Sequence, residues 1–250
     1  MNNIANNSKR MPLWAQLYFL LTLAVLAFGF HKAITAPTEA TMGNLYRVFF
    51  YHFPHTILSF VFPYLNCGAS LLYLYWRSRN PSRALAADAF ALASAELTVL
   101  YASVGLATGM LWGRAAWGIW WTWDARLTTY LLLWLLYVSY ILLRRFSGDG
   151  TGSSNTAILS AALAVFAAID IPICYMSIRW WRTQHPAPVF AGGADSGIDP
   201  SMYPAVLWNL LAWALWGAFI LGLRYALERR RQRARTDFSL HTLTHQPEPL

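Results

Sequence analysis

Residues 204–223 read PAVLWNLLAWALWGAFILGL, an apolar stretch that contains no Asp, Glu, Lys or Arg. A hydrocarbon core about 30 Å thick requires about 20 such residues of a helix that crosses it. Inside that core, only a helix or a closed barrel satisfies the hydrogen-bonding groups of the backbone. The stretch therefore predicts a membrane-spanning helix.

Five further apolar runs precede this one, separated by short polar segments. The six runs are approximately residues 14–30, 54–76, 88–111, 127–145, 157–176 and 204–227. Apolar residues make up 57% of the 250 residues and charged residues only 12%, whereas soluble domains are about 25% charged. We expect an all-α integral membrane bundle of six transmembrane helices, with residues 1–250 as a single membrane domain.

The distribution of basic residues predicts the orientation of these helices. With a cytoplasmic N-terminus, 13 of the 19 Lys and Arg residues lie inside and six outside. The outer six are Lys32, Arg47, Arg114, Arg126, Arg179 and Arg182. The positive-inside rule then places both termini in the cytoplasm, with residues 228–250 as a cytoplasmic tail. The net charge of +8 belongs mostly to this inner flank, which favours contact with anionic membrane lipid and not with nucleic acid.

The first apolar run also has to be distinguished from a cleaved signal peptide. It follows Lys9 and Arg10, as the apolar part of a signal peptide follows a basic start. The run is long for a signal peptide, however, and no convincing cleavage pattern follows it. We expect a retained helix.

Two kinds of chemistry have no motif in the sequence. Cys67 and Cys174 lie inside predicted helices and form neither a C-x-x-C nor a C-x-x-C-H pattern. We therefore expect neither dithiol chemistry nor thioether attachment of a prosthetic group. No G-x-x-x-x-G-K motif occurs, so ATP hydrolysis is not expected of this chain.

Tryptophans are concentrated in the predicted outer loops. They are Trp112, Trp117, Trp120, Trp121, Trp123, Trp180 and Trp181. An interfacial aromatic belt explains one or two tryptophans at each helix end, but not four within residues 117–123. If this stretch is helical, three of the four share one face and form an apolar shelf suited to a flat aromatic ligand. Arg114 and Arg126 flank the shelf and would pair with carboxylates of that ligand.

Three histidines accompany these tryptophans: His52 and His55 near the second helix, and His185 in the third outer loop. A lone histidine at a membrane boundary is usually only a polar tip, but two imidazoles from different loops can form a six-coordinate haem centre. Because Pro54 suits the first turn of a helix, we place His55 on the helix. His52 would then lie on the preceding loop, where it is freer to reach a ligand.

Three motifs carry a resemblance to a known family. Residues 117–128, WGIWWTWDARLT, resemble the tryptophan-rich WWD signature of haem-handling proteins in cytochrome c biogenesis. Residues 51–54, YHFP, are similar to the outer histidine segment of the haem exporter protein C family (CcmC). Residues 171–185, IPICYMSIRWWRTQH, resemble the second histidine segment of that family. The likeness covers nearly the whole chain and includes the six-helix plan.

The resemblance implies a role for each matching residue. His52 and His185 would be the axial metal ligands of a haem b that is bound non-covalently and transiently, which selects His52 over His55. The haem platform and its partner surface would comprise Trp117, Trp121, Trp123, Asp124 and Arg126.

Some residues depart from the family pattern. They are His55, Asp170 and Pro186. Carboxylates inside membrane helices are costly, so we expect Asp170 and Glu96 to pair with polar groups of the bundle or to be protonated. We assign neither to the haem site.

The function implied by the resemblance is haem handling, and we expect no enzyme activity. The chain would hold haem at the periplasmic face of the bacterial inner membrane and deliver it to a periplasmic haem chaperone, CcmE. The other implied partners are the small membrane protein CcmD and the ABC transporter subunits CcmA and CcmB.

Two other functions remain open. A respiratory cytochrome b subunit would carry its histidines within helices at bilayer depth. A solute permease would show interrupted helices in paired repeats, of which only a kink at Pro172 is present.

Overall fold

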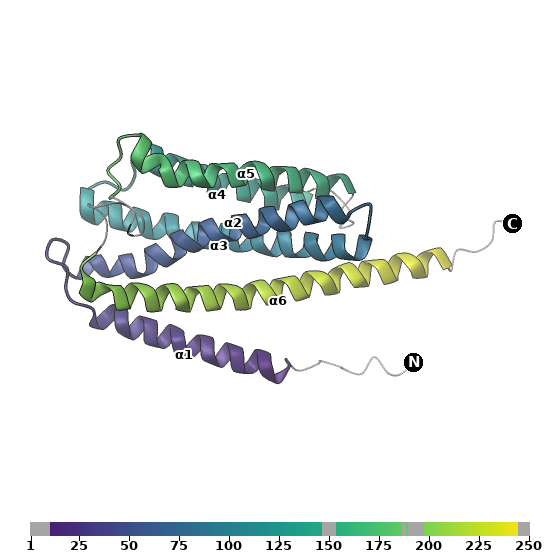
Figure 1. Cartoon of the computed structure of the whole chain (residues 1–250), viewed down its shortest axis with the longest axis horizontal. Helices are drawn as coiled ribbons and strands as arrows, with labels where there is room; N and C mark the ends of the chain where they lie inside the picture. The colour runs from purple at the N-terminus through teal and green to yellow at the C-terminus, as the bar shows by residue number, and fades with distance from the viewer. Residues whose placement is uncertain (1–10, 147–153, 187–188, 190–197, 245–250) are drawn as a thin grey trace.

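The computed structural model of the 250-residue chain describes residues 11–146, 154–186, 189 and 198–244, with side chains to residue 237 (Figure 1). Its α-helices are α1 (Leu13–Thr35), α2 (Phe49–Trp76), α3 (Pro81–Trp117), α4 (Ala125–Phe146), α5 (Ser154–Trp180) and α6 (Tyr203–Thr244). Two short 3-10 helices, η1 (Asn44–Val48) and η2 (Pro200–Met202), precede α2 and α6. Six helices among the described residues are long and apolar enough to cross a membrane. The predicted all-α, six-helix, multi-pass architecture is confirmed.

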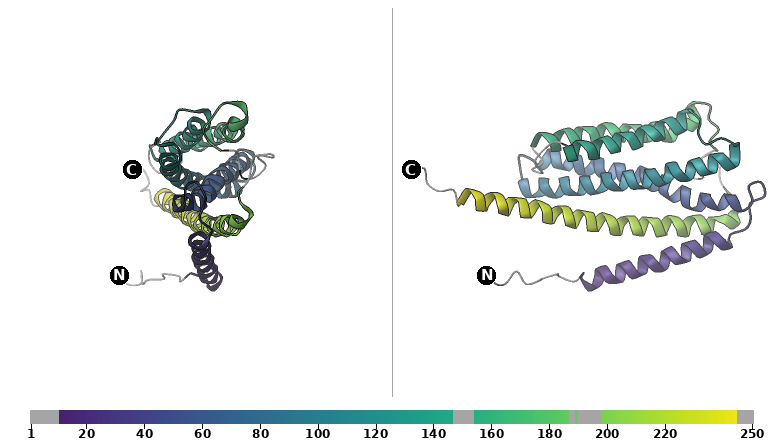
Figure 2. Two further views of the ribbon diagram at one scale, coloured as in Figure 1. Left: turned by 90° about the vertical axis from the view of Figure 1, so that its left-hand side faces the viewer. Right: turned by 180° about the vertical axis from the view of Figure 1, so that it is seen from behind.

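The helices run roughly along one common axis (Figures 1 and 2). α2 and α3 form the most extensive pair, and both contact α6, while α4 and α5 pack together and against them. α1 packs mainly against α6 at the edge of the bundle. The connections that follow α1, α3 and α5 all lie at one end of the bundle, which we call the loop end.

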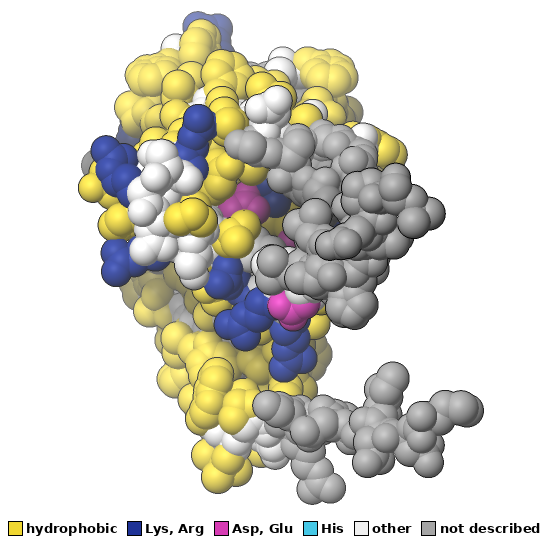
Figure 3. All heavy atoms as spheres, turned by 90° about the vertical axis from the view of Figure 1, so that its right-hand side faces the viewer, with side chains coloured by type: hydrophobic (Ala, Val, Ile, Leu, Met, Phe, Trp, Pro, Cys, Tyr) yellow, Lys and Arg dark blue, Asp and Glu magenta, His cyan; other side chains and the backbone are white. Residues whose placement is uncertain are grey.

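The opposite end holds the start of α1 and the end of α6. Figure 3 looks onto this opposite end, where several Lys and Arg side chains gather among apolar ones. The excess of basic residues on this side is the reason for predicting that both termini lie in the cytoplasm. The orientation itself stays a prediction.

Three helix boundaries differ from those predicted. α2 begins at Phe49 and not near Pro54, so the placement of His52 on a preceding loop is wrong. η1 runs directly into α2, and Pro54 is accommodated within the resulting helix, as prolines often are where neighbouring helices satisfy the freed backbone groups. α3 extends to Trp117 and takes in residues that were predicted as loop.

The third difference is at the C-terminal end, where α6 continues beyond residue 227 to Thr244. The segment begins with Glu, Gln, Ala and five Arg residues within positions 228–235, and these residue types have high helix propensity. It therefore stays helical after the apolar run ends. Residues 1–10, 147–153 and 245–250, which include parts of the predicted tail and inner loops, lie outside the described residues.

Two carboxylates within the bundle form ion pairs with arginines of neighbouring helices. Arg144 of α4 donates two hydrogen bonds to Asp88 of α3, at 2.6 and 2.8 Å, and both side chains are largely buried. Glu96 of α3 pairs in the same bidentate way with Arg224 of α6, as expected of a carboxylate at this depth. Asp170 differs, because its buried Oδ2 has no hydrogen-bond partner in the described part of the chain.

We expect Asp88→Ala to destabilise the bundle, because it leaves the Arg144 guanidinium buried without its carboxylate. Such a loss costs about 3 kcal/mol. The measurement is the apparent melting temperature of the purified protein in detergent. The control is Arg145→Ala, since Arg145 is the exposed neighbour of Arg144 on α4, and exposed charges contribute at most about 1 kcal/mol. Equal melting temperatures for the two variants would contradict the expectation.

Candidate functional site

A cavity opens at the loop end of the bundle, between α2, α3, α4 and the segment that follows α5. The space within it, together with the solvent at its mouth, amounts to about 1120 Å³. Its walls are mainly aromatic and aliphatic, and its ionisable side chains are those of His52, Arg126, Tyr130, Tyr175 and His185. No Asp or Glu is among the described residues that line it.

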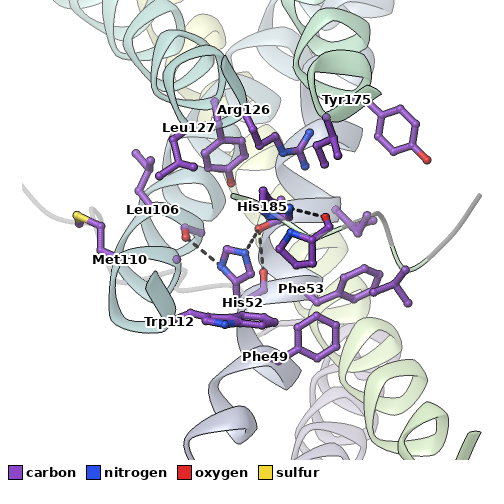
Figure 4. Close-up of a pocket in the computed structure, with 18 of the residues that line it drawn as sticks. Phe49, His52, Phe53, Leu106, Met110, Trp112, Arg126, Leu127, Tyr175 and His185 are labelled. Carbon is purple, nitrogen blue, oxygen red and sulfur yellow. Dashed lines mark hydrogen bonds between the residues drawn. The ribbon is translucent and has the colours of Figure 1, made fainter. Parts of the chain in front are cut away.

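His52 projects into this cavity from the first turns of α2 (Figure 4). Its Nδ1 lies 3.1 Å from the carbonyl oxygen of Gly105 and 3.0 Å from Oγ1 of Thr108, both on α3. A carbonyl can only accept, so Nδ1 carries the proton and donates it. The other ring nitrogen, Nε2, is therefore unprotonated. It lies 3.5 Å from Oγ1 of Thr56, but that hydroxyl donates its proton to the carbonyl oxygen of His52 at 3.0 Å, so the Nε2 lone pair is left for a metal.

His185 reaches the same cavity from the segment after α5. Its Nδ1 donates to the carbonyl oxygen of Pro186 at 2.8 Å, and its backbone N–H donates to Oγ1 of Thr183 at 3.1 Å. Nε2 is again the unprotonated nitrogen. Loss of solvation and the nearby Arg126 guanidinium lower the pKa of His185 to about 4, so the imidazole is neutral at neutral pH and able to bind a metal.

His55 faces away from the cavity. It is buried, its Nδ1 donates to the carbonyl oxygen of Tyr51 at 2.7 Å, and its ring lies against those of Tyr101 and Trp213. His55 projects from another side of α2 than His52, toward Tyr101 and Trp213, and is not among the residues that line the cavity. The structure thus separates two histidines that the residue pattern alone left as alternatives.

The tryptophan-rich loop does not form a continuous helix. α3 ends at Trp117 because Gly118 adopts a left-handed conformation with φ of 76°, which glycine tolerates and other residues rarely adopt. Residues 118–124 are then irregular, so the helical face proposed for three tryptophans is wrong. Trp117 and Trp121 nevertheless line the cavity, whereas Trp123 is 75% exposed.

Arg126 and Asp124, predicted as neighbours in one platform, have different surroundings. Arg126 is buried in the cavity wall, donates to the carbonyl oxygen of Cys174 at 2.6 Å and lies over the ring of Phe60. Asp124 lies outside the cavity lining and accepts a hydrogen bond from the backbone N–H of Leu127 at 3.0 Å. That bond is an N-terminal cap of α4.

Comparison with known proteins gives the family of the chain. The profile described as "Heme exporter protein C" matches residues 2–239. The chain belongs to this family.

Relatives of the same name extend over most of the chain. The protein "Heme exporter protein C" of Bradyrhizobium diazoefficiens is 34% identical over 241 residues, which cover 93% of this chain and 87% of the relative. That of Escherichia coli strain K12 is 29% identical over 232 residues, covering 87% and 85%. That of Rhodobacter capsulatus is 30% identical over 231 residues, covering 91% and 88%. The resemblance noted from the three motifs is confirmed.

Within this heme exporter protein C family member, sequence reasoning missed the part of the cavity formed by α3 and α4. Gly105, Thr108 and Gly109 of α3 and Tyr130 of α4 all line the cavity or contact His52. The sequence does contain a pattern that indicates the role of α3: Gly105, Gly109 and Gly113 recur every four residues. That spacing is typical of a helix face on which neighbouring groups approach closely.

We expect Asp124→Ala to lower stability by about 1 kcal/mol, because it removes the N-terminal cap of α4. Asp124→Asn is expected to retain the cap, since its side-chain oxygen also accepts from the backbone N–H of Leu127. Melting temperatures of the two variants beside the unmodified protein provide the measurement. If Asn proves as destabilising as Ala, the charge of Asp124 matters and the cap does not explain its role.

Proposed function

We propose that the protein is a haem-handling membrane subunit of c-type cytochrome biogenesis that binds haem b non-covalently in this cavity and passes it to a periplasmic haem chaperone. In this proposal His52 and His185 are the two axial ligands. The observation that carries it is that two histidines from distant segments each present an unprotonated Nε2 to one aromatic cavity. The relatives' name, heme exporter protein C, supports the same cargo.

The chemistry of the cavity walls suits haem. A haem has a broad apolar ring, an iron that accepts imidazole ligands, and two propionate groups at one edge. Aromatic side chains such as Trp112, Trp117 and Trp121 offer a large apolar contact area. Arg126 supplies a cation for a propionate, and no carboxylate lines the described cavity to compete for it. This surrounding favours propionate binding over chaperone docking as the role of Arg126.

The exposed aromatic side chains at the loop end have a different proposed role. Trp123 is 75% exposed, and Trp120, Trp180 and Trp181 are more than half exposed. They are close in sequence to the residues that line the cavity. Because they are exposed, they do not enclose a ligand. We assign them to the membrane interface and to the surface that meets the chaperone.

The proposed setting is a bacterial inner membrane with both termini in the cytoplasm and the loop end in the periplasm. The proposed partners are the chaperone CcmE, the small membrane protein CcmD and the ABC subunits CcmA and CcmB. ATP hydrolysis is assigned to those subunits because this chain carries no phosphate-cradling motif.

A respiratory cytochrome b subunit would hold the same kind of haem. Its histidines would lie deep in the membrane, whereas His52 is at the first turns of α2 and His185 follows the end of α5. Rapid reduction of the bound haem by quinol would favour the respiratory function. Slow reduction combined with haem transfer to the chaperone would favour the proposal.

The first test is the absorption spectrum of the purified protein after supply of haem. We expect low-spin, six-coordinate haem in the unmodified protein and in His55→Ala, because His55 does not line the cavity. His52→Ala and His185→Ala are each expected to weaken this spectrum or convert it to high spin. Four identical spectra, or no haem in any sample, would contradict the ligand assignment.

A second test addresses Arg126 through the propionates. We expect the unmodified protein to bind haem about tenfold more tightly than haem dimethyl ester, in which both propionates are esterified, since a hydrogen bond between charged groups is worth about 1.5 kcal/mol or more. Arg126→Gln is expected to bind both compounds alike, and Arg126→Lys to keep part of the preference. A preference undiminished in Arg126→Gln would show that other groups hold the propionates.

A further inference from the structure

The two cavity histidines are held in different ways. His52 is fixed by a separate helix: Gly105 and Thr108, its hydrogen-bond partners, lie more than 50 residues away in the sequence. Among the described residues, the hydrogen-bond partners of His185 are Thr183 and Pro186 of its own segment. A displacement of residues 183–186 would carry the His185 ring and its partners together, whereas His52 can move only against α3.

The hydroxyl of Thr108 fixes the direction of the His52 hydrogen bond. This hydroxyl donates to the carbonyl oxygen of Val104 at 2.6 Å. Its single proton is therefore committed, so Oγ1 can only accept from Nδ1 of His52. Thr108 and the Gly105 carbonyl thus both select the ring form in which Nε2 is unprotonated.

Gly109 allows the His52 ring to lie against α3. A Cβ placed on Gly109 would lie 3.1 Å from Cε1 of His52, closer than side chains normally approach. The ring is consequently packed against the backbone of α3, with one edge hydrogen-bonded and the other directed into the cavity. Any side chain at position 109 would have to displace it.

We propose that the two histidines are not equivalent: His52, positioned by Thr108 and Gly109, is the fixed axial ligand, and His185 is the ligand exchanged when haem is handed on. This inference rests on the proposed function and deepens it. In the exchange an incoming ligand supplies the electron pair that His185 withdraws, so no proton or electron is gained or lost. Haem then leaves through the side of the cavity lined by His185 and Pro186.

Replacement of each histidine by glycine tests the asymmetry. His185→Gly is expected to keep haem on His52, and added imidazole should fill the vacated position and restore the low-spin spectrum. His52→Gly is expected to retain at least about tenfold less haem, with or without imidazole. Haem per protein is measured by the pyridine haemochrome assay on the full-length protein in detergent. Equal retention by the two variants, or better retention by His52→Gly, would overturn the proposal.

Substitutions on α3 test the positioning of His52. We expect Thr108→Val to release haem to apomyoglobin about tenfold faster than the unmodified protein, with altered electron paramagnetic resonance g values of the low-spin iron. Thr108→Ser keeps the acceptor and should restore both properties. The matched control is Thr98→Val, because Thr98 makes the same bond to the carbonyl four residues before it on α3 but lies outside the cavity lining.

Gly109→Ala should likewise speed haem release and shift the g values, whereas Gly68→Ala, at a helical glycine with open space around it, should change neither. The yield and elution volume of each variant in size-exclusion chromatography report whether it folds. If His52→Ala and His185→Ala lose low-spin haem but Thr108→Val and Gly109→Ala match the unmodified protein, the positioning proposal fails and the proposed function stands. If the unmodified protein binds no haem, the proposed function itself fails.

Discussion

A helix inside a hydrocarbon core has no water available to satisfy an unpaired polar group, and this constraint decides where the protein can place reactive side chains. Within the bundle, polar groups mostly bind one another or a backbone carbonyl. Arg144 binds Asp88, and Asn66 donates to the carbonyl oxygen of Ala91. The two histidines and the guanidinium of Arg126, which has only neutral partners among the described residues, are instead found around the cavity, at the end of the bundle where the loops are. The location of the candidate site thus follows from the solvent in which the helices lie.

The shape of that cavity depends on the small residues of α3. Because Gly105 has no side chain, the hydroxyl of Tyr130 from α4 approaches the α3 backbone, where it meets Ser59 of α2 at 2.9 Å. One turn further along, Gly109 makes room for the ring of His52. A larger side chain at either position would separate α2 or α4 from α3. The position of the His52 ring therefore depends on how closely α2, α3 and α4 approach one another.

The fold could be predicted from the sequence because a membrane span is a local property: about 20 apolar residues suffice to identify it. His52 and His185 could be named only through the resemblance, since the residue pattern left His52 and His55 as alternatives. The contacts of His52 with Thr108 could not be predicted, because they depend on the register between α2 and α3. Local pattern also failed at Gly118, where a left-handed residue ends α3 and turns Trp120 and Trp121 in different directions.

The surroundings of Arg126 favour binding of an anion at a cost in stability. Its guanidinium is buried in the wall, and the carbonyl oxygen of Cys174 supplies only a neutral partner at 2.6 Å. A buried charge with no ion partner costs stability, and a carboxylate in the wall would lower that cost. The same carboxylate would occupy the cation and repel an anionic ligand, which would weaken binding of a propionate. The charge pattern of the cavity is thus the one expected under the proposed function, in which the negative charge arrives with a haem propionate and leaves with it. This also explains why the two bidentate ion pairs, Asp88–Arg144 and Glu96–Arg224, lie elsewhere in the bundle.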